Sequence, residues 1–550
     1  MAEKRNAVVR QAAFLMAAQM ISSVVGLLYR SPLDGIIGDV GDGYYTYAND
    51  WYIIILLISS YSIPSAVSKV MAERLAVGQY KNAQKVFHAA LIYALIVGTI
   101  GASVAWFGAP VLLRSMPNAI PALRVLAPTI LFSGFLGVMR GYFQSHNTMK
   151  PTAFSQIAEQ IMNAIVSVLA AYLLTRPFVG SGLKEEIGKH GAAGGTIGTG
   201  AGVVMGLSVM LLIYRANYKK LNKKLEQDRS YASESYWDVF KAIMLMGTPI
   251  ILSTCVYNAT AVVDQMVFTE LMTAKGISAS VISSEYGIFG YKFLTISNIP
   301  IALASATSTA LIPAVATSLA AGSKKGAVQK IDDCVRMTLF IAIPSCFGLA
   351  ILSFPIIRLL YPSGNVSGAA VLLVVGAITV VFYSLSTVMN GVLQGMGHPG
   401  IPVRNGLIAL AVNIAVCAGF VWFLNLGAMS IVFSVIAYSF TIMVLDMFSI
   451  RKYLGYGLGG TKNIIPPLKA SVVMGAVVAA VYWIPAKLLP DLYTRYLVSG
   501  ITTVIAVMAG VLVYMVVYTK TTGMTDDELR TVPMGTRILQ VLYKLHLRKR

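Results

Sequence analysis

Long, continuous apolar runs are the feature that most constrains how this 550-residue chain can fold. A helix that crosses a lipid bilayer needs about 20 mostly apolar residues, and runs of this length recur from one end of the sequence to the other. Apolar residues make up 56% of the chain and charged residues 12%, whereas a soluble domain is typically about 25% charged. The runs therefore exclude a water-soluble globular protein, and because they do not alternate they also exclude a β-barrel.

The sequence predicts an all-α, polytopic membrane protein with fourteen transmembrane helices. The predicted spans are residues 9–30, 47–72, 86–108, 121–145, 151–175, 196–216, 238–272, 285–319, 333–358, 367–394, 402–424, 428–450, 466–486 and 493–518. The first run follows a basic start, as a signal peptide does, but it lacks a convincing cleavage site, and we interpret it as a retained helix. No segment of catalytic-domain size is left over, so we do not expect an enzyme.

Basic residues indicate how these helices are oriented in the membrane. If both termini are cytoplasmic, 32 of the 43 Lys and Arg residues lie on the inner side and 10 on the outer side, with Lys292 inside a span. The positive-inside rule requires such an asymmetry, and one missed helix would destroy it. The net charge of +20 therefore indicates topology and contact with anionic lipids, and we expect no nucleic-acid partner.

An internal repeat divides the chain into lobes. Residues 75–83 (LAVGQYKNA) match residues 319–327 (LAAGSKKGA), and residues 138–144 (VMRGYFQ) match residues 388–394 (VMNGVLQ) at nearly the same offset. Six spans per repeat is an even number, which predicts two parallel six-helix lobes of the kind found in alternating-access transporters. We expect an N-lobe at 1–217, a basic cytoplasmic linker at 218–237, a C-lobe at 238–450 and two further helices at 466–518. The cytoplasmic tail at 519–550 is either an amphipathic helix or a disordered basic segment.

Charged residues at membrane depth are costly, so each one needs a reason. The residues concerned are Arg30, Asp50, Arg140, Glu159, Asp264, Glu285, Lys292 and Asp446. Arg140 and Asp446 lie near the inner ends of their spans, where we expect the side chains to snorkel to water. Glu159 faces either a cavity or a neighbouring cation.

Four of these residues are stronger candidates for a functional site. Arg30 and Asp50 flank the first predicted outer loop, where they are either functional or simply hydrated. Asp264 and Lys292 lie deep in the seventh and eighth spans, and they either line a functional site or pair with each other.

Prolines mark the helices that we expect to bend. Pro64 lies in the second span, and Pro300 and Pro313 lie in the eighth, which is the equivalent helix of the second repeat. A proline frees a backbone carbonyl and bends a helix, which suits a gating element that lines a lumen. The glycine-rich stretch 191–202 lacks the ending of a phosphate-binding loop, and we interpret it as an ordinary loop. Cysteines and histidines are scattered without metal-ligand spacing, so no metal is expected.

Three segments resemble a known group of transporters. They are ISSVVGLLYRSPLDGIIGDVGDGYYTYA, SSYSIPSAVSKVMAERLAVGQYKNA and GVMRGYFQSHNTMKPTAFSQIAEQIMN. They resemble the polysaccharide-exporter branch of the MOP superfamily, in particular its Gram-positive MurJ-type lipid II flippases and the spore-cortex group of stage V sporulation protein B. The resemblance covers essentially the whole chain. It implies a two-lobe, 14-helix flippase of the bacterial plasma membrane that moves an undecaprenyl-pyrophosphate-linked saccharide to the outer leaflet.

The resemblance also implies a cationic central cavity. Related flippases carry arginines in the first helix that face this cavity, and Arg30 lies in the matching segment, whereas Lys292 matches a cation of the eighth span approximately. Both side chains are candidates for charge-assisted hydrogen bonds to pyrophosphate. Asp50, Glu159 and Asp264 are candidates either for binding a coupling Na⁺ or H⁺ or for holding the cations in place. The membrane potential would help to drive an anion outward, and no other cofactor is expected.

Several functions remain open at this point. Lipid II or a related peptidoglycan precursor is the first choice of substrate, and another lipid-linked polysaccharide unit is the second. A multidrug antiporter of the MATE branch needs an acid in its N-lobe helices, and the first span has none. A polyprenyl-linked glycosyltransferase needs catalytic residues in its outer loops, and the longest of these, 176–195, offers only Glu185 and Glu186 as acids. We expect a monomer whose partners are the polyprenyl-linked saccharide, anionic lipids and the cell-wall synthesis machinery.

Overall fold

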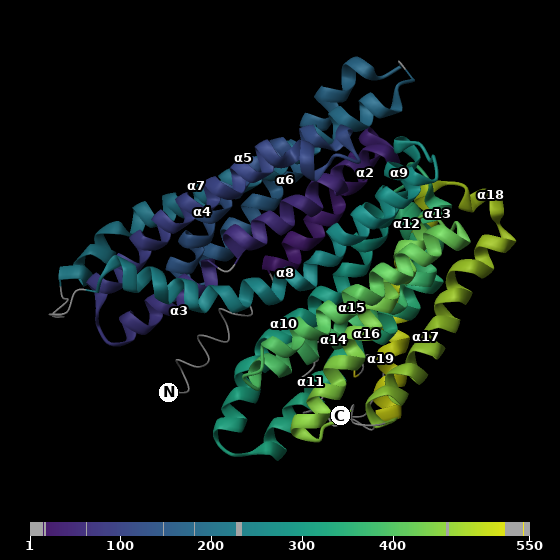
Figure 1. The fold of residues 1–550 in the computed structure, drawn as a ribbon. Helices are drawn as coiled ribbons and strands as arrows, with labels where there is room; N and C mark the ends of the chain where they lie inside the picture. The colour runs from purple at the N-terminus through teal and green to yellow at the C-terminus, as the bar shows by residue number, and fades with distance from the viewer. Residues whose placement is uncertain are drawn as a thin grey trace. The chain divides into compact units, whose positions relative to one another are not determined.

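The structure is a computed structural model, and it describes residues 15, 18–61, 63–146, 148–180, 182–226, 234–457, 461–522 and 543. The side chains of residues 61, 219–226, 246, 247, 249, 250, 252, 253, 256, 257, 303–310, 313, 314 and 461 lie outside this description. Within it, every regular element is a helix (Figure 1). Contacts divide the chain into two compact units, Met1–Tyr291 and Lys292–Arg550. The lobe boundaries expected from the repeat stay a prediction, because units defined by contacts need not coincide with units defined by a sequence repeat.

The first unit is built mainly from long helices. Its helices are α2 (Arg30–Leu56), α3 (Ile63–Ala76), α4 (Tyr80–Leu112), α5 (Ile120–Ser145), α6 (Lys150–Thr175), α7 (Lys184–Glu226), α8 (Tyr236–Ala274) and α9 (Ala279–Gly287). A π-helical turn, η1 (Leu57–Tyr61), joins α2 to α3, and a second one, η4 (Ile288–Phe293), follows α9. Such turns are rare and are found frequently at functional sites.

The second unit has the same construction. Its helices are α10 (Leu294–Ala320), α11 (Lys324–Ile351), α12 (Ser353–Leu360), α13 (Val366–Gly376), α14 (Ile378–Gly395), α15 (Gly400–Gly419), α16 (Ala428–Leu454), α17 (Thr461–Leu488), α18 (Pro490–Tyr493) and α19 (Tyr496–Thr522). A third π-helical turn, η5 (Phe420–Leu424), extends α15. The helices α17 and α19 pack against each other, and α17 also packs against α11. Buried aromatic side chains, including Phe340, Tyr514 and Tyr518, fill the core between them.

Ten helical segments of the described chain are long and apolar enough to cross a membrane. They are Arg30–Ala76, Tyr80–Leu112, Pro117–Ser145, Lys150–Phe178, Lys184–Tyr218, Lys324–Ile351, Gly400–Leu424, Ala428–Leu454, Lys462–Leu488 and Tyr496–Thr522. The helices α13 and α14, which are bent by 49° relative to each other, make an eleventh if they form one broken span. The prediction of an all-α, multi-pass membrane protein is confirmed.

The segment 31–46, which the hydropathy pattern places in an outer loop, is helical, so that part of the prediction is wrong. It belongs to α2, which is interrupted at Gly38 with φ 66° and ψ 173°. This backbone conformation is essentially restricted to glycine. Leu33, Tyr44 and Tyr45 on this segment are buried, and α2 packs against α7 and α9. A helix that contacts other helices need not be strongly apolar, so the hydropathy of residues 31–46 did not indicate a helix.

The glycine-rich stretch 191–202 is also helix rather than loop, because its glycines face a neighbouring helix. A Cβ atom on Gly198 would lie 2.4 Å from the backbone nitrogen of Ser167 on α6, and one on Gly194 would lie 2.6 Å from the Cα atom of Ala171. Gly202 approaches α6 in the same way. Small residues at every fourth position let two membrane helices pack at short distance. Composition alone suggested a loop, whereas the recurrence of glycine at every fourth residue indicates the face of α7 that packs against α6.

Prolines expected to bend helices occupy different environments. Pro64 is the second residue of α3, and it packs against α5, where a Cβ atom on Gly141 would lie 2.8 Å from the Pro64 carbonyl oxygen. Pro300 is buried within α10. Pro313 also lies within α10, but its side chain is outside the described residues. The role of the three prolines in gating stays a prediction.

Residues 227–233 of the linker and nearly all of the predicted tail also lie outside the described residues.

Candidate functional site

Arg30 begins α2 and is held against a buried tyrosine of the same unit. Its guanidinium carbon lies 4.9 Å from the ring centroid of Tyr291, and the Tyr291 hydroxyl donates to the Arg30 carbonyl oxygen at 3.3 Å. Tyr291 is 1% exposed, and its ring meets that of Tyr45 edge to face at 5.5 Å. A cation above an aromatic face is stabilised by the ring quadrupole. Arg30 is therefore a fixed, half-buried cation at the start of a helix.

Lys292 belongs to the second unit and is completely buried. Its Nζ atom donates to the carbonyl oxygen of Ser363 at 3.1 Å and lies 5.7 Å from the ring centroid of Tyr361. Both residues belong to the turn between α12 and α13, and Tyr361 is itself 0% exposed. Lysine is almost never fully buried unless its ammonium is paired, and here a carbonyl and an aromatic face surround it.

Asp50 lies at a polar contact among α2, α8 and α9. Its Oδ2 atom accepts a hydrogen bond from the Tyr286 hydroxyl at 2.7 Å, and the same hydroxyl lies 3.1 Å from the Ala261 carbonyl oxygen. Asp264 follows Ala261 by one turn of α8 and is 1% exposed. The next residue on α8, Gln265, donates from Nε2 to the Tyr47 carbonyl oxygen at 3.0 Å. Two of the three predicted acids thus lie where α2 meets α8.

Glu159 forms an ion pair with Arg140, so a neighbouring cation faces it. Arg140 Nη2 lies 2.6 Å from Glu159 Oε2, and Arg140 Nε donates to Ser155 Oγ at 3.1 Å. The side chains are 17% and 21% exposed, respectively. The pair gives Arg140 a carboxylate partner, and the expectation that its side chain also snorkels to water stays a prediction. This pair lies between α5 and α6, apart from the contact around Asp50.

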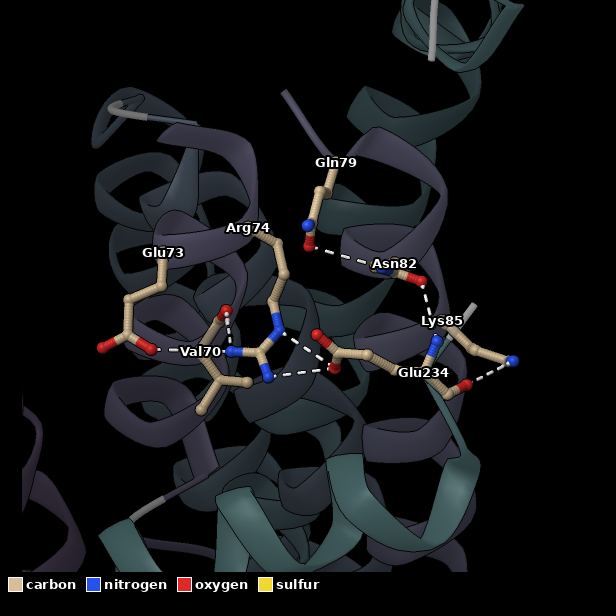
Figure 2. Close-up of polar contacts among 7 residues, drawn as sticks. All are labelled: Val70, Glu73, Arg74, Gln79, Asn82, Lys85 and Glu234. Carbon is tan, nitrogen blue, oxygen red and sulfur yellow. Dashed lines mark hydrogen bonds and ion pairs between the residues drawn. The ribbon is translucent and has the colours of Figure 1, made fainter. Parts of the chain in front are cut away.

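A group of polar contacts that the sequence did not reveal anchors the start of α8 to α3 and α4 (Figure 2). Arg74 donates from Nε and Nη2 to Glu234 Oε2 at 3.3 and 3.0 Å. Lys85 donates to the Glu234 carbonyl oxygen, and the Glu234 N–H donates to Asn82 Oδ1 at 3.2 Å. Glu234 directly precedes Ser235, the N-cap of α8. We call Arg74, Asn82, Lys85 and Glu234 the α8 clamp.

Three acids lie close together on α2. Asp34, Asp39 and Asp42 each bring one carboxylate oxygen to within 4.8 Å of the others, on either side of the break at Gly38. Oxygen ligands suit hard cations such as Mg²⁺ and Ca²⁺. Asp34 and Asp42 are buried, and Asp39 is partly exposed. Neighbouring acidic groups are also common in proteins without a bound ion. We assign no metal to this group.

Comparison with known families identifies the chain. The polysaccharide biosynthesis protein family matches residues 8–318, which is more than half of the 550 residues. The chain belongs to the polysaccharide biosynthesis protein family. The MatE family matches residues 249–418 of the same chain. The family resemblance inferred from the sequence motifs is confirmed.

Individual relatives of this polysaccharide biosynthesis family member match nearly its whole length. It is 25% identical over 513 residues to lipid II flippase MurJ of Bacillus subtilis, a match that covers 90% of this chain and 92% of MurJ. It is 22% identical over 532 residues to stage V sporulation protein B of the same organism, covering 96% and 97% of the two chains. Both matches therefore extend over nearly the full length of the two chains and are not confined to one domain.

Solved structures agree with this assignment. Lipid II flippase MurJ in an inward closed conformation superimposes with a TM-score of 0.61 at 16% identity, covering 92% of this chain and 98% of that one. The eukaryotic MATE transporter AtDTX14 gives a TM-score of 0.59 at 14% identity, covering 84% and 99%. At such identities the likeness establishes a fold, and the fold is that of MurJ and MATE transporters.

Proposed function

We propose that this protein is an alternating-access flippase that moves an undecaprenyl-pyrophosphate-linked saccharide from the inner to the outer leaflet of the bacterial plasma membrane. The observation that carries the proposal is the match to lipid II flippase MurJ over nearly the full length of both chains, in sequence and in fold. Within that group we favour lipid II or a related peptidoglycan precursor as substrate. The relatives are transporters, which supports transport rather than enzymatic chemistry.

The topology we propose has fourteen transmembrane helices with both termini in the cytoplasm. The eleven spans described above leave α8, α10 and the short apolar helix Ala18–Leu28 to be added. The helices α8 and α10 are 39 and 27 residues long, which is enough to cross a bilayer at 1.5 Å per residue. This total supports the count that the positive-inside distribution requires.

Arg30 is the residue we propose for binding the pyrophosphate. The planar guanidinium of arginine can form two parallel hydrogen bonds to phosphate oxygens, and its place above Tyr291 keeps it pre-oriented. Lys292 is a second candidate, but its ammonium donates to Ser363 and is completely buried, so it would have to leave that carbonyl to reach a ligand. We therefore favour Arg30 as the pyrophosphate-binding residue and keep Lys292 as a candidate that becomes available only when its hydrogen bond to Ser363 breaks.

The acids have separate proposed roles. Asp50 and Asp264 lie where α2 meets α8, and we propose that they bind a coupling Na⁺ or H⁺ while these helices move against each other. Glu159 instead holds Arg140 in place, as its ion pair indicates. The membrane potential is worth about 2.3 kcal/mol per charge per 100 mV and favours outward movement of the anionic headgroup.

Complementation tests this function. A bacterium depleted of its own lipid II flippases would express the wild type, Arg30→Ala, or the matched control Arg176→Ala, which removes an exposed arginine. We expect the wild type and the control to restore growth and outer-leaflet lipid II, and Arg30→Ala to fail at equal membrane expression. Restoration by all three would refute the assignment of Arg30, and failure of all three would refute lipid II as the substrate.

A second candidate function is a cation-coupled multidrug antiporter. The match of the MatE family to residues 249–418 is the observation that favours it. If no variant restores lipid II, drug efflux from energised cells expressing the wild type becomes the deciding measurement, and accumulation equal to that of cells without the protein would exclude this alternative.

A further inference from the structure

Two cations of one helix hairpin contact Glu234, which lies far from them in the sequence. Arg74 belongs to the last turn of α3 and Lys85 lies near the start of α4, and the turn between the helices passes through Gly78 with φ 78°. Glycine adopts this conformation without steric cost. Both side chains point toward Glu234, which follows them by 160 and 149 residues (Figure 2). The hairpin therefore presents two cations to a residue that it does not itself contain.

The Arg74 guanidinium is held in place, but Glu234 uses it only in part. Arg74 Nη1 donates to the Val70 carbonyl oxygen at 3.1 Å, one turn earlier on α3. Nε and Nη2 both donate to the same oxygen, Glu234 Oε2, at 3.3 and 3.0 Å. Arginine binds an anion best when two nitrogens meet two different oxygens in parallel, as a phosphate group allows. Glu234 therefore does not make the strongest contact that this guanidinium can offer.

Lys85 contacts the main chain of Glu234 and not its carboxylate. Its Nζ atom donates to the Glu234 carbonyl oxygen and lies 5.1 Å from the ring centroid of Tyr236. A neutral carbonyl oxygen is a weaker partner for an ammonium group than a charged oxygen is. Glu234 thus offers the two cations one carboxylate oxygen and one carbonyl oxygen, whereas a phosphate group offers several charged oxygens.

The topology proposed above places the turn between α3 and α4 on the cytoplasmic side, where the phosphate groups of inner-leaflet lipids lie. Arg30 ends the first predicted span and lies toward the outer side, so the two arginines are not parts of one site. We propose that Arg74 and Lys85 form a second phosphate-binding site, which Glu234 occupies in this structure and from which the pyrophosphate of a lipid-linked saccharide displaces it. The identity of this ligand rests on the proposed function.

Displacement of Glu234 would release the start of α8. Glu234 directly precedes Ser235, the N-cap of α8, whose Oγ atom accepts a hydrogen bond from the Trp237 N–H at 3.2 Å. Val239 and Ile243, further along α8, belong to the apolar core that contains residues of α3 and α4, so they keep the rest of this end in place. Because Arg74 and Lys85 cannot hold Glu234 and a phosphate group at the same time, ligand binding at the cytoplasmic entrance is coupled to movement of the first turn of α8.

The test measures binding of inorganic pyrophosphate to the purified full-length protein in phosphatidylcholine nanodiscs, at an ionic strength held constant with potassium chloride. Trp237 reports the displacement, because it lies two residues after the N-cap, is 69% exposed and stacks on Phe240 at 5.6 Å. The variant Trp237→Phe identifies the part of the fluorescence that comes from this side chain. We expect a saturable change of the Trp237 signal in the wild type.

Substitutions distinguish a phosphate site from a clamp that is only structural. Arg74→Gln and Lys85→Gln should each weaken pyrophosphate binding by about tenfold, since each removes a charged donor. Glu234→Gln should strengthen it by about tenfold, because the competing carboxylate is lost. A structural clamp predicts no such gain. Lys81→Gln and Glu73→Gln, which make the same changes of charge at exposed positions of the hairpin, should alter the affinity by less than about threefold.

The proposal is overturned if the wild type gives no saturable signal, if Glu234→Gln does not raise the affinity, or if the two cation variants bind as the wild type does. Should a cation variant fail to fold, the wild type and Glu234→Gln still decide the matter.

Two further nanodisc preparations identify the source of the phosphate group. One contains undecaprenyl pyrophosphate and the other an equal mole fraction of phosphatidylglycerol. We expect the first to compete with inorganic pyrophosphate and the second not to compete. Equal competition by phosphatidylglycerol would overturn the assignment to a lipid-linked saccharide and identify a phospholipid site. Because no step involves lipid II or transport, failed complementation by a protein that binds pyrophosphate here would refute the flippase function and not this site.

Discussion

We predict that the ion pair of Arg74 and Glu234 in the α8 clamp stabilises the attachment of the start of α8 within the first unit. We consider the variants Arg74→Gln, Glu234→Gln and the double variant, which together form a double-mutant cycle. Arg74 and Glu234 are separated by 160 residues and come from α3 and from the residue before the N-cap of α8. Their coupling energy therefore reports a tertiary contact and not local helix propensity.

The magnitude of this coupling follows from exposure and geometry. Arg74 is 17% exposed and Glu234 29%, and two guanidinium nitrogens contact one carboxylate oxygen at 3.0 and 3.3 Å. Exposed ion pairs are worth about 0.2–1 kcal/mol, whereas breaking a buried pair costs about 3–5 kcal/mol. A partly shielded pair lies between these limits, and we expect a coupling energy of about 1–2 kcal/mol, or roughly tenfold in the unfolding equilibrium constant.

The assay is reversible unfolding of the purified protein in mixed detergent micelles, from which the free energy of unfolding is obtained for each variant. Glu73 supplies the control, because its carboxylate also lies near Arg74, at 3.5 Å, but is 51% exposed. A cycle between Arg74 and Glu73 should give about 0.5 kcal/mol or less. The reasoning is refuted if the Arg74–Glu234 cycle is additive within error, or if the two cycles give equal couplings.

The remaining predictions concern packing and the tyrosines near the candidate site. Gly198→Ala should lower the free energy of unfolding by about 1–3 kcal/mol, because the new Cβ atom meets α6. In the control Gly348→Ala, the new Cβ atom has nothing within 4 Å, so the variant should be neutral or stabilised by up to about 1 kcal/mol. Thermal unfolding in detergent compares the two variants. Tyr286→Phe removes the donor to Asp50 and should cost about 1–3 kcal/mol. Tyr291→Phe keeps the ring beside the arginine and should have a smaller effect on both stability and complementation. Equal losses from the two tyrosine changes would contradict this account of their hydroxyl groups.

Much of the fold could be predicted from the sequence, because the bilayer imposes its constraint residue by residue. Apolar runs long enough to cross a membrane indicate helices directly, since a backbone in hydrocarbon must satisfy its own hydrogen bonds. The motifs around Arg30 and Gly141 also indicated the family. Hydropathy missed the helix at 31–46 and the part of α7 at 191–195, where helices face other helices, whereas residues 196–202 belong to a predicted span. Hydropathy measures transfer into lipid, so it does not detect a helix whose surface is covered by protein.

The sequence by itself therefore determined the helical class of the protein, its multi-pass character and its family. Only the tertiary structure decided which charges meet: Arg140 has Glu159 as its partner, and Lys292 contacts a carbonyl and an aromatic ring. Asp446 is completely buried and accepts a hydrogen bond from Asn405, so the expectation that it snorkels to water is wrong. The physical reason is that the free-energy cost of placing a residue in the membrane depends on its own side chain, whereas the identity of its partner depends on how helices distant in sequence pack together.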